Sequence, residues 1–252
     1  MKIGVLIKYC PDSEAMIEVS GGQVKTSEVK YSVSPYDEYA VEEALRIIEV
    51  QGDGEVVLFN VGPERNTKGI KDELARGAHR AVHIVTEEEE VGCGRVAAML
   101  AAALEAEGAD LILCGWKGID YDCGLTGTLV AELMGLPHVA LVTKLELGDG
   151  KAVCHRQVEG GEEVIEVPLP AVFAVQKGIN EPRYPSLKGI MAAKKKQIDK
   201  KTPADLGVDL PEGRAEYVGF RKPPAKQPGK KFEGPESAAQ VVRLLREEAK
   251  VI

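Results

Sequence analysis

The sequence predicts an α/β protein built on a doubly wound, mostly parallel sheet of Rossmann-like type, with a small antiparallel extension and an extended C-terminal arm. Up to about residue 142, short apolar runs rich in β-branched residues alternate with amphipathic stretches. Such alternation is typical of parallel strands joined by helices. Residues 143–175 change to short alternating segments with GDG and EGG turns, and from about residue 200 proline, glycine and lysine dominate.

The first part of the chain alternates strands with helices around one small hairpin. Apolar runs predict strands, and apolar residues at helical spacing predict helices, the second of which ends at Gly77. The expected elements are a strand at 2–7, a hairpin at 16–24 turning at Gly21-Gly22, a helix from Asp37 to about Val50, a strand at 55–61 and a helix at 67–76.

The next part begins with the same alternation and then departs from it. The expected elements are a strand at 80–85, an alanine-rich helix at 93–107, a strand at 111–114, a helix at 126–134 stopped by Gly135 and Pro137, and a strand beginning at 139–142. Short strands follow at 143–147, 152–158, 163–167 and 171–175. Their patterns and tight turns predict antiparallel pairing.

Two parts are expected along the chain. Residues 1–199 form the α/β domain, including segment 177–196, and residues 200–252 form the arm. Residues 200–234 have too few apolar side chains for a core of their own, and 235–248 is a terminal amphipathic helix. A half-apolar helix is hard to stabilise alone, so we expect the arm to pack on a partner subunit.

Composition excludes several classes of protein. The 252 residues carry a formal net charge of −8, which argues against nucleic-acid binding because phosphate contacts need a basic surface. No apolar stretch approaches the ~20 residues of a membrane span, and the N-terminal run is too short for a signal peptide. The five cysteines lack CxxC and zinc-ligand spacing, which fits a reducing compartment, the cytoplasm or, in a eukaryote, the mitochondrial matrix.

A glycine-rich loop at 115–127 follows an expected strand. In a doubly wound sheet, ligands bind outside the carboxyl ends of the strands, where the strand order reverses. Thr126 and Gly127 begin a helix whose free N–H groups would face an anion. Asp120 and Asp122 could accept bonds from ribose hydroxyls, but carboxylates repel phosphates, so at least one should point away. Alone, such a loop predicts nucleotide binding only weakly.

Other conspicuous side chains have plainer explanations. His79 and His83 lie four residues apart but lack the HExxH context of a zinc site, and no metal is expected. Trp116 either stacks on adenine or only covers the core. Cys123 stands beside a helix start, which would lower its pKa, yet no base is near it in the sequence, so a nucleophile is not expected.

Segment 177–196, KGINEPRYPSLKGIMAAKKK, combines a rigid turn, an apolar tip and a basic run. Its prolines keep the chain non-helical until about Ser186, a candidate N-cap. Leu187, Ile190 and Met191 then share one helical face. Either the leucine packs into its own domain, or the segment is an exposed recognition loop whose lysines meet an acidic patch on a partner.

Three blocks of sequence resemble one family. NEPRY with the following leucine and IMAAKKK matches a family pattern that ends in IMKAKKK, and SVSPYDEYAVEEALRI at 32–47 matches NPFDEYAVEEALRL. GWKGIDYDCGLTG at 115–127 matches GKQAIDxDxxQTG. The blocks keep their order and spacing to about Asp209, and the chain therefore resembles the beta subunit of electron transfer flavoprotein.

The resemblance implies an electron carrier subunit without a catalytic residue of its own. It implies a heterodimer with an alpha subunit that holds most of the FAD, electrons received from an acyl-CoA or similar dehydrogenase and passed towards a quinone oxidoreductase, and AMP as a structural ligand. Partner recognition falls to Tyr184, Leu187, Ile190 and Met191, with Leu187 entering a pocket on the dehydrogenase. The implied cofactor-binding residues are Leu6, Ser34, Pro35, Tyr36, Asp37, Val61, Gly115, Trp116, Lys117, Gly118, Ile119, Asp120, Tyr121, Asp122, Cys123, Gly124, Leu125, Thr126 and Gly127.

Departures from the family pattern leave alternatives open. Ser34 replaces an asparagine and Gly124-Leu125 a polar pair, so side-chain bonds there would be lost while backbone bonds survive. One branch of the family binds a second FAD in the AMP position, oxidises NADH and splits the electrons between two acceptors. Tyr121 replaces that branch's glycine and favours AMP. An AMP-sensing regulatory domain is a third reading, but such a sensor does not need the recognition segment.

Overall fold

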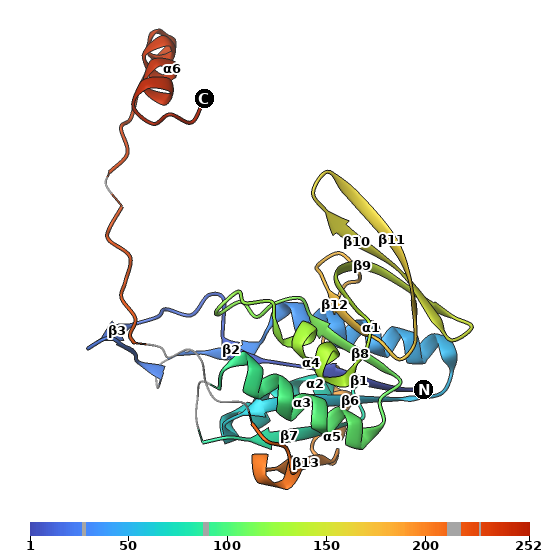
Figure 1. Cartoon of the computed structure of the whole chain (residues 1–252). Coiled ribbons are helices and arrows are strands. Elements are labelled where there is room, and N and C mark those ends of the chain that lie inside the picture. Colours follow the sequence, from blue (N-terminus) through green and yellow to red (C-terminus); the bar gives the residue numbers. More distant parts are fainter. Residues whose placement is uncertain (27–28, 88–90, 211–217, 227) are drawn as a thin grey trace.

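The computed structural model describes residues 1–26, 29–87, 91–210, 218–226 and 228–252. Its centre is a nine-stranded sheet in the order β11-β10-β9-β12-β8-β1-β6-β7-β13 (Figure 1). The seven strands β9, β12, β8, β1, β6, β7 and β13 pair in parallel with their neighbours in this order. At the other edge, β10 pairs antiparallel with both β9 and β11. The bounds are β1 Lys2–Leu6, β6 Glu55–Gly62, β7 Arg80–Val85, β8 Leu111–Gly115, β9 His138–Gly148, β10 Lys151–Val158, β11 Gly161–Pro168, β12 Val172–Val175 and β13 Ile198–Lys201.

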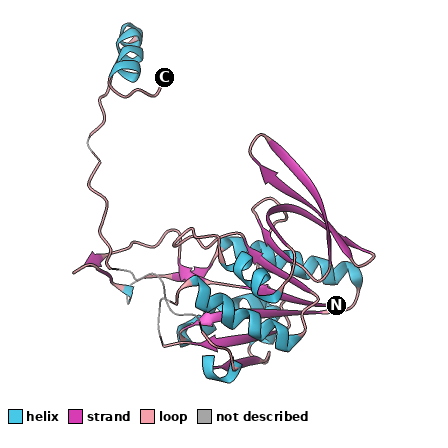
Figure 2. Ribbon diagram, viewed as in Figure 1, coloured by secondary structure: helices cyan, strands magenta, loops and turns pink. Residues whose placement is uncertain are grey.

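Helices cover both faces of the sheet (Figure 2). One apolar core lies between the sheet and α1, α2 and α5, and the other lies between the sheet and α3 and α4. This arrangement confirms the predicted doubly wound class. The α-helices are α1 Pro35–Gln51, α2 Thr67–Arg76, α3 Cys93–Glu107, α4 Thr126–Met134, α5 Leu187–Ala193 and α6 Ala238–Glu247; the 3₁₀ turns are η2 Glu64–Asn66, η3 Pro203–Leu206 and η4 Pro235–Ser237.

The sequence explains why these elements form. The central strands are mostly apolar, as expected for strands that helices cover on both faces, and Phe59 and Phe173 are fully buried. The helix ends also agree with the sequence, because α2 stops at Gly77 and α4 at Gly135. Two small two-stranded sheets lie beside this layer, β2 Tyr9–Pro11 with β5 Tyr31–Val33, and β3 Val19–Ser20 with β4 Gln23–Val24.

The predicted antiparallel extension is partly wrong. Residues 138–148 form one long strand, β9, with a positive φ at Leu141 and a register shift in its pairing with β12. The second half of β9 pairs antiparallel with β10, as predicted for 143–147, and β10 and β11 form an antiparallel hairpin that projects from the sheet (Figure 1). Strand β12 instead enters the parallel sheet between β8 and β9, because its unbroken apolar run suits a strand buried on both faces.

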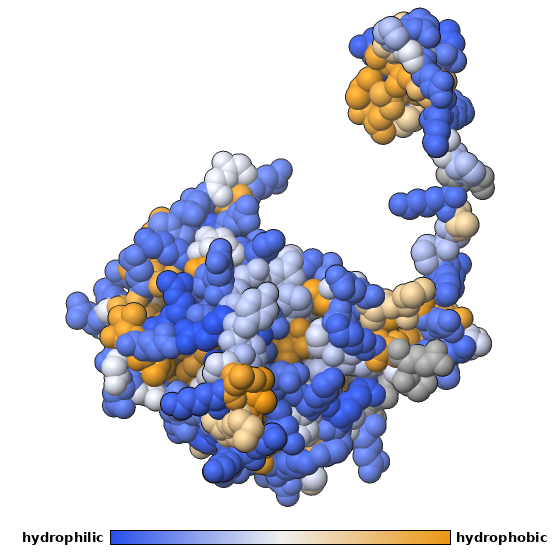
Figure 3. Space-filling view, turned by 180° about the vertical axis from the view of Figure 1, so that it is seen from behind, coloured by the Kyte–Doolittle hydropathy of each residue, from blue (hydrophilic) through white to orange (hydrophobic). Residues whose placement is uncertain are grey.

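The sheet continues past residue 199, where the sequence places the start of the arm. Strand β13 runs to Lys201 and pairs with β7, and Leu206 and Leu210 pack against the core beside α3. Further along the chain, the N–H of Phe220 donates to the carbonyl oxygen of Gly22 at 2.8 Å. The chain then extends away from the domain and ends in α6, which has no buried residue (Figures 1 and 3).

Among the described residues, no helix combines the length and apolar character that crossing a bilayer requires. The longest is α1, which carries several charged side chains.

Candidate functional site

A cavity of about 270 Å³ lies at the carboxyl ends of β1 and β8. These neighbouring strands form the switch point of the sheet, because the chain after β1 continues to β6 on one side and the chain after β8 continues to β9 on the other. Loops leaving a switch point diverge and create a crevice for a ligand. The predicted residues that line this cavity are Leu6, Asp37, Val61, Gly115, Trp116, Lys117, Gly118, Asp120, Tyr121, Cys123, Gly124, Leu125, Thr126 and Gly127.

The remaining predicted residues lie next to the cavity and do not line it. These are Ser34, Pro35, Tyr36, Ile119 and Asp122. Ser34 is fully buried, and among the described residues its hydroxyl has no partner. Tyr36 supports the cavity wall from behind, since its ring meets the Trp116 ring edge-on at 5.7 Å between centroids. The roles assigned to these residues stay predictions.

Asp37 joins the two strand ends at the crevice. Its side chain is buried in the first turn of α1, where Oδ2 accepts the N–H of Lys8 at 2.7 Å and Oδ1 accepts the N–H of Gly115 at 2.9 Å. Burial raises the pKa of this carboxyl to about 7, and the two N–H bonds act in the opposite direction. Asp37 therefore fixes the spacing of the loops after β1 and β8.

Replacing Asp37 with asparagine should change how stability depends on pH. The folded-state pKa of about 7 exceeds the ordinary value of 3.8, so the carboxyl stabilises the fold most at low pH and loses that contribution as pH rises towards 7. Between pH 5 and pH 7, we expect the free energy of unfolding of the wild type to fall by about 2 kcal/mol more than that of Asp37→Asn. Urea denaturation at both pH values measures this, and parallel pH profiles would contradict it.

The two loop aspartates are balanced by lysines. Lys8 Nζ lies 2.5 Å from Asp120 Oδ2, and Lys117 Nζ lies 2.7 Å from Asp122 Oδ2. Asp122 is exposed and points away from the lining, as the repulsion argument expects. Lys8 and Lys117 both line the cavity, so the loop presents cations together with the carboxylates to a ligand phosphate.

The start of α4 provides an anion-binding end. Its N-cap residue is Leu125, whose side chain cannot accept a hydrogen bond from the first turn. Thr126 and Gly127 line the cavity, and the first N–H groups of a helix have no intrahelical partner. The arrangement leaves backbone donors for a phosphate.

Trp116 covers the core beside α3 and α4 and also borders the cavity, and its stacking on adenine stays a prediction. The Nε1 atom is buried, and the described residues offer it no acceptor. Lys117 Nζ lies 4.4 Å from the ring centroid.

The expected low pKa of the Cys123 thiol is wrong. Burial raises the pKa, and the nearby Cys93 raises it further. A neutral thiol is a poor nucleophile. The histidines have structural partners: His79 Nδ1 accepts the N–H of Val56 at 3.0 Å, and His83 Nε2 lies 3.1 Å from the carbonyl oxygen of Gly62.

Several residues of the cavity were missed by sequence reasoning. Lys8 follows β1, and Arg65 follows β6, so both stand at carboxyl ends of central strands, a position that could have identified them. The Arg65 guanidinium lies 4.5 Å from the centroid of the Tyr31 ring, and Tyr31 stacks on Tyr9. Tyr31 gave no such signal, because only the fold of the 9–33 region brings it to the cavity.

Segment 177–196 folds as predicted around Ser186. The Ser186 hydroxyl accepts the N–H of Gly189 at 3.0 Å and caps α5. Leu187 is 85 % exposed, which excludes the alternative that it packs into its own domain. Tyr184, Ile190 and Met191 are also exposed, so with Leu187 they form an apolar surface patch on α5 and just before it.

The basic run that follows α5 has partners within the domain. Lys196 Nζ donates to the carbonyl oxygens of Leu74 at 2.9 Å and Ala78 at 2.6 Å, at the end of α2. Lys200 pairs with Glu64. Lys194 and Lys195 are exposed. Lys194 and Lys195 therefore face solvent, whereas Lys196 and Lys200 bind groups of the domain.

Comparisons with known proteins show the family of this chain. The family model described as "Electron transfer flavoprotein domain" matches residues 21–206. The chain is 37 % identical over 258 residues to "Electron transfer flavoprotein subunit beta" of Bacillus subtilis, with all of both chains covered. The chain belongs to the electron transfer flavoprotein beta-subunit family.

Other relatives have the same name. The Syntrophomonas wolfei protein is 38 % identical over 92 % of this chain and 90 % of its own length, and the Homo sapiens protein is 36 % identical over 92 % and 93 %. Membership gives the chain a role in flavin-dependent electron transfer and, as a beta subunit, an alpha subunit as partner.

Proposed function

We propose that this chain is the beta subunit of a heterodimeric electron carrier that binds AMP in the crevice between β1 and β8. The alpha subunit holds most of the FAD, which supplies the redox chemistry. Electrons come from an acyl-CoA or similar dehydrogenase and go towards a quinone oxidoreductase. The compartment is the cytoplasm, or the mitochondrial matrix in a eukaryote. The observation that carries the proposal is the switch-point cavity with an uncapped helix start on its wall.

AMP fits the chemistry of this cavity. The first turn of α4, together with Lys8 and Lys117, would hold the phosphate. Asp120 would serve the ribose hydroxyls, because its Oδ1 is buried without a partner among the described residues while Oδ2 binds Lys8. The Trp116 ring offers a surface for adenine.

The apolar patch on α5 is the proposed docking surface for the dehydrogenase. Its residues Tyr184, Leu187, Ile190 and Met191 are exposed. Large apolar side chains that cluster on a surface usually mark an interface. The exposed Lys194 and Lys195 flank the end of α5. The partner surface is therefore an apolar pocket with acidic groups beside it.

A second candidate is the electron-bifurcating carrier with FAD in place of AMP. One observation favours it: the cavity continues from loop 115–127 past Val61 to Arg65 and Tyr31. The stacked Tyr9 and Tyr31 rings, with centroids 5.7 Å apart, would provide an aromatic wall for a second ring system. Against it, Tyr121 lines the cavity at the loop position where the bifurcating pattern has glycine.

Purification of the assembled heterodimer, followed by acid release and mass spectrometry of its small molecules, tests the proposal. We expect one FAD and one AMP per heterodimer, and no bleaching of the flavin by NADH alone. Two FAD per heterodimer, together with bleaching by NADH, would establish the bifurcating alternative. A chain that stays monomeric in the presence of its alpha subunit would contradict both.

A further inference from the structure

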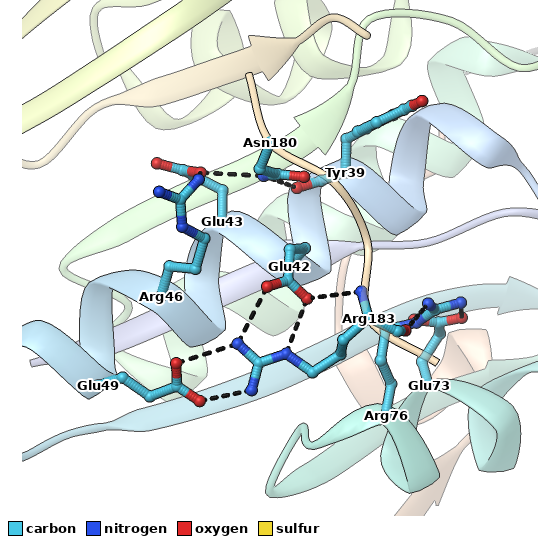
Figure 4. A network of polar contacts seen from close by, with 9 residues as sticks. All are labelled: Tyr39, Glu42, Glu43, Arg46, Glu49, Glu73, Arg76, Asn180 and Arg183. Carbon is cyan, nitrogen blue, oxygen red and sulfur yellow. Dashed lines mark hydrogen bonds and ion pairs between the residues drawn. The ribbon is translucent and has the colours of Figure 1, made fainter. Parts of the chain in front are cut away.

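The segment that leads into α5 has no regular secondary structure, yet charged side chains tie it to the domain. Residues 181–186 form neither helix nor strand. Figure 4 shows that Asn180 and Arg183, at the start of this stretch, reach carboxylates and a carbonyl on α1. A segment without a backbone ladder depends on such bonds for its position.

Arg183 makes the most extensive of these contacts. Its guanidinium lies between Glu42 and Glu49, about two turns apart on α1, with Nε–Oε2 2.8 Å and Nη2–Oε1 3.0 Å to Glu42. Nη1 and Nη2 also reach the two oxygens of Glu49, at 2.5 and 3.0 Å. The backbone N–H of Arg183 donates to Glu42 Oε2 at 3.1 Å. Two bidentate pairs fix both the position and the plane of the guanidinium.

Glu42 makes this contact strong. Its side chain is only 6 % exposed, so leaving the carboxylate without a cation would incur a desolvation penalty. Arg76 on α2, whose guanidinium pairs with Glu73 at 2.8 Å, donates to the carbonyl oxygen of Arg183 (Figure 4). The peptide of Arg183 is therefore held from α1 through its N–H and from α2 through its carbonyl.

The far end of α5 is also held. Lys196 binds three carbonyl oxygens at the end of α2, and Ala193 is buried against the same core. The helix of Leu187–Ala193 is thus fixed at both ends, while the apolar side chains between these ends point into solvent. An interface that is ordered before binding loses less conformational entropy on docking.

We propose that Arg183 is a positioning residue for docking: by joining α1 and α2 to the segment before α5, it holds the apolar patch of α5 in its binding conformation without touching the partner. The proposal rests on the docking role of α5 under the proposed function. It assigns the Glu42, Glu49 and Arg183 cluster to affinity for the partner and not to electron transfer.

The test compares variants of the assembled heterodimer as electron acceptors of an acyl-CoA dehydrogenase supplied with its acyl-CoA substrate. For Arg183→Ala we expect the KM for the carrier to rise roughly three- to tenfold, with kcat unchanged. Arg183→Lys keeps the charge but cannot make two bidentate pairs, so its KM should also rise. Arg156→Ala is the matched control, because the Arg156 side chain is 33 % exposed, close to the 35 % of Arg183, and pairs with Glu163 on β11 at 3.6 Å, outside this network.

Leu187→Ala separates this proposal from the proposed function. If Leu187→Ala raises KM and Arg183→Ala does not, the positioning role is wrong and docking through α5 stands. If neither variant changes KM, docking through α5 is wrong and the positioning role falls with it. In the double variant, the effects should combine to less than their product, because a displaced helix no longer presents residue 187 to the partner.

Hydrogen exchange supplies a readout that does not need the partner. In the heterodimer, the amides of 187–193 should exchange faster in Arg183→Ala than in the wild type, and at the wild-type rate in Arg156→Ala. Unchanged exchange in Arg183→Ala would overturn the proposal. If Arg183→Ala fails to assemble, Arg183→Lys is measured in its place with the same expected directions.

Discussion

Replacing Gly115 with alanine should weaken retention of the nucleotide by the purified heterodimer. A Cβ at this position would lie 2.5 Å from Asp37 Oδ1 and 2.6–2.7 Å from Cβ and the carbonyl carbon of Tyr36. Backbone atoms of α1 cannot move away at low cost, so the loop after β8 must shift. The shift breaks the bond between Asp37 and the N–H of residue 115 and changes the width of the crevice.

The measurement is the amount of AMP released per heterodimer by acid. We expect the Kd for AMP to rise at least tenfold in Gly115→Ala, since loss of a buried hydrogen bond with displacement of the loop exceeds about 1.4 kcal/mol, and the retained AMP to fall accordingly. Gly148→Ala is the control, because an added Cβ there meets no atom within 4 Å. A Gly115→Ala protein that retains a full complement of AMP would show that the loop after β8 does not form the site.

Truncating Leu187 to alanine should weaken docking to the dehydrogenase by about 1–3 kcal/mol, the usual range for an apolar anchor at an interface. The effect should appear in KM for the carrier and not in the stability of the fold, because the side chain is 85 % exposed. Thermal unfolding of the variant should match that of the wild type.

Rates of flavin reduction at limiting dehydrogenase provide the measurement. Val164→Ala serves as a control, since Val164 is also an exposed apolar residue, 62 % exposed, but lies on β11 and not on α5. Equal rates for Leu187→Ala and the wild type would remove the docking role from α5. A loss shared by Val164→Ala would instead point to a nonspecific effect of surface truncation.

Local signals in the sequence were sufficient for several helices. The bounds of α2, α3 and α4 equal the predicted ranges, because amphipathic spacing and a terminal glycine mark each of them. The turn of segment 177–196 and its Ser186 cap were predicted for the same reason: proline and an N-cap act within a few residues.

Strand partners could not be read in the same way. Residues 172–175 have the apolar run of a buried strand, but nothing within the run says that β8 and β9 flank it in parallel. The antiparallel prediction came from the neighbouring hairpin, which is close in sequence. Pairing is decided by which strands the sheet brings together, and β8 lies far earlier in the chain.

The candidate site also contains residues that the local sequence identified and contacts that only the fold creates. Loop 115–127 and the start of α4 were recognised from glycines, polar residues and family blocks, and they do line the cavity. The hydrogen bond by which Asp37 holds the loop after β8 could not be recognised, because its donor, the N–H of Gly115, is 78 positions away in the sequence. The pairing of Lys8 with Asp120 also joins distant parts of the chain.

The sequence by itself determined the fold class, the family and the helix that carries the exposed leucine, since each depends on residues that are neighbours along the chain or on contiguous blocks. The tertiary structure alone decided which carboxylates hold the backbone at the crevice and which arginine holds the recognition segment. Those contacts join α1 to β8 and to the segment before α5. A carboxylate takes the donors that folding brings within about 3 Å of it, and sequence separation does not specify that distance.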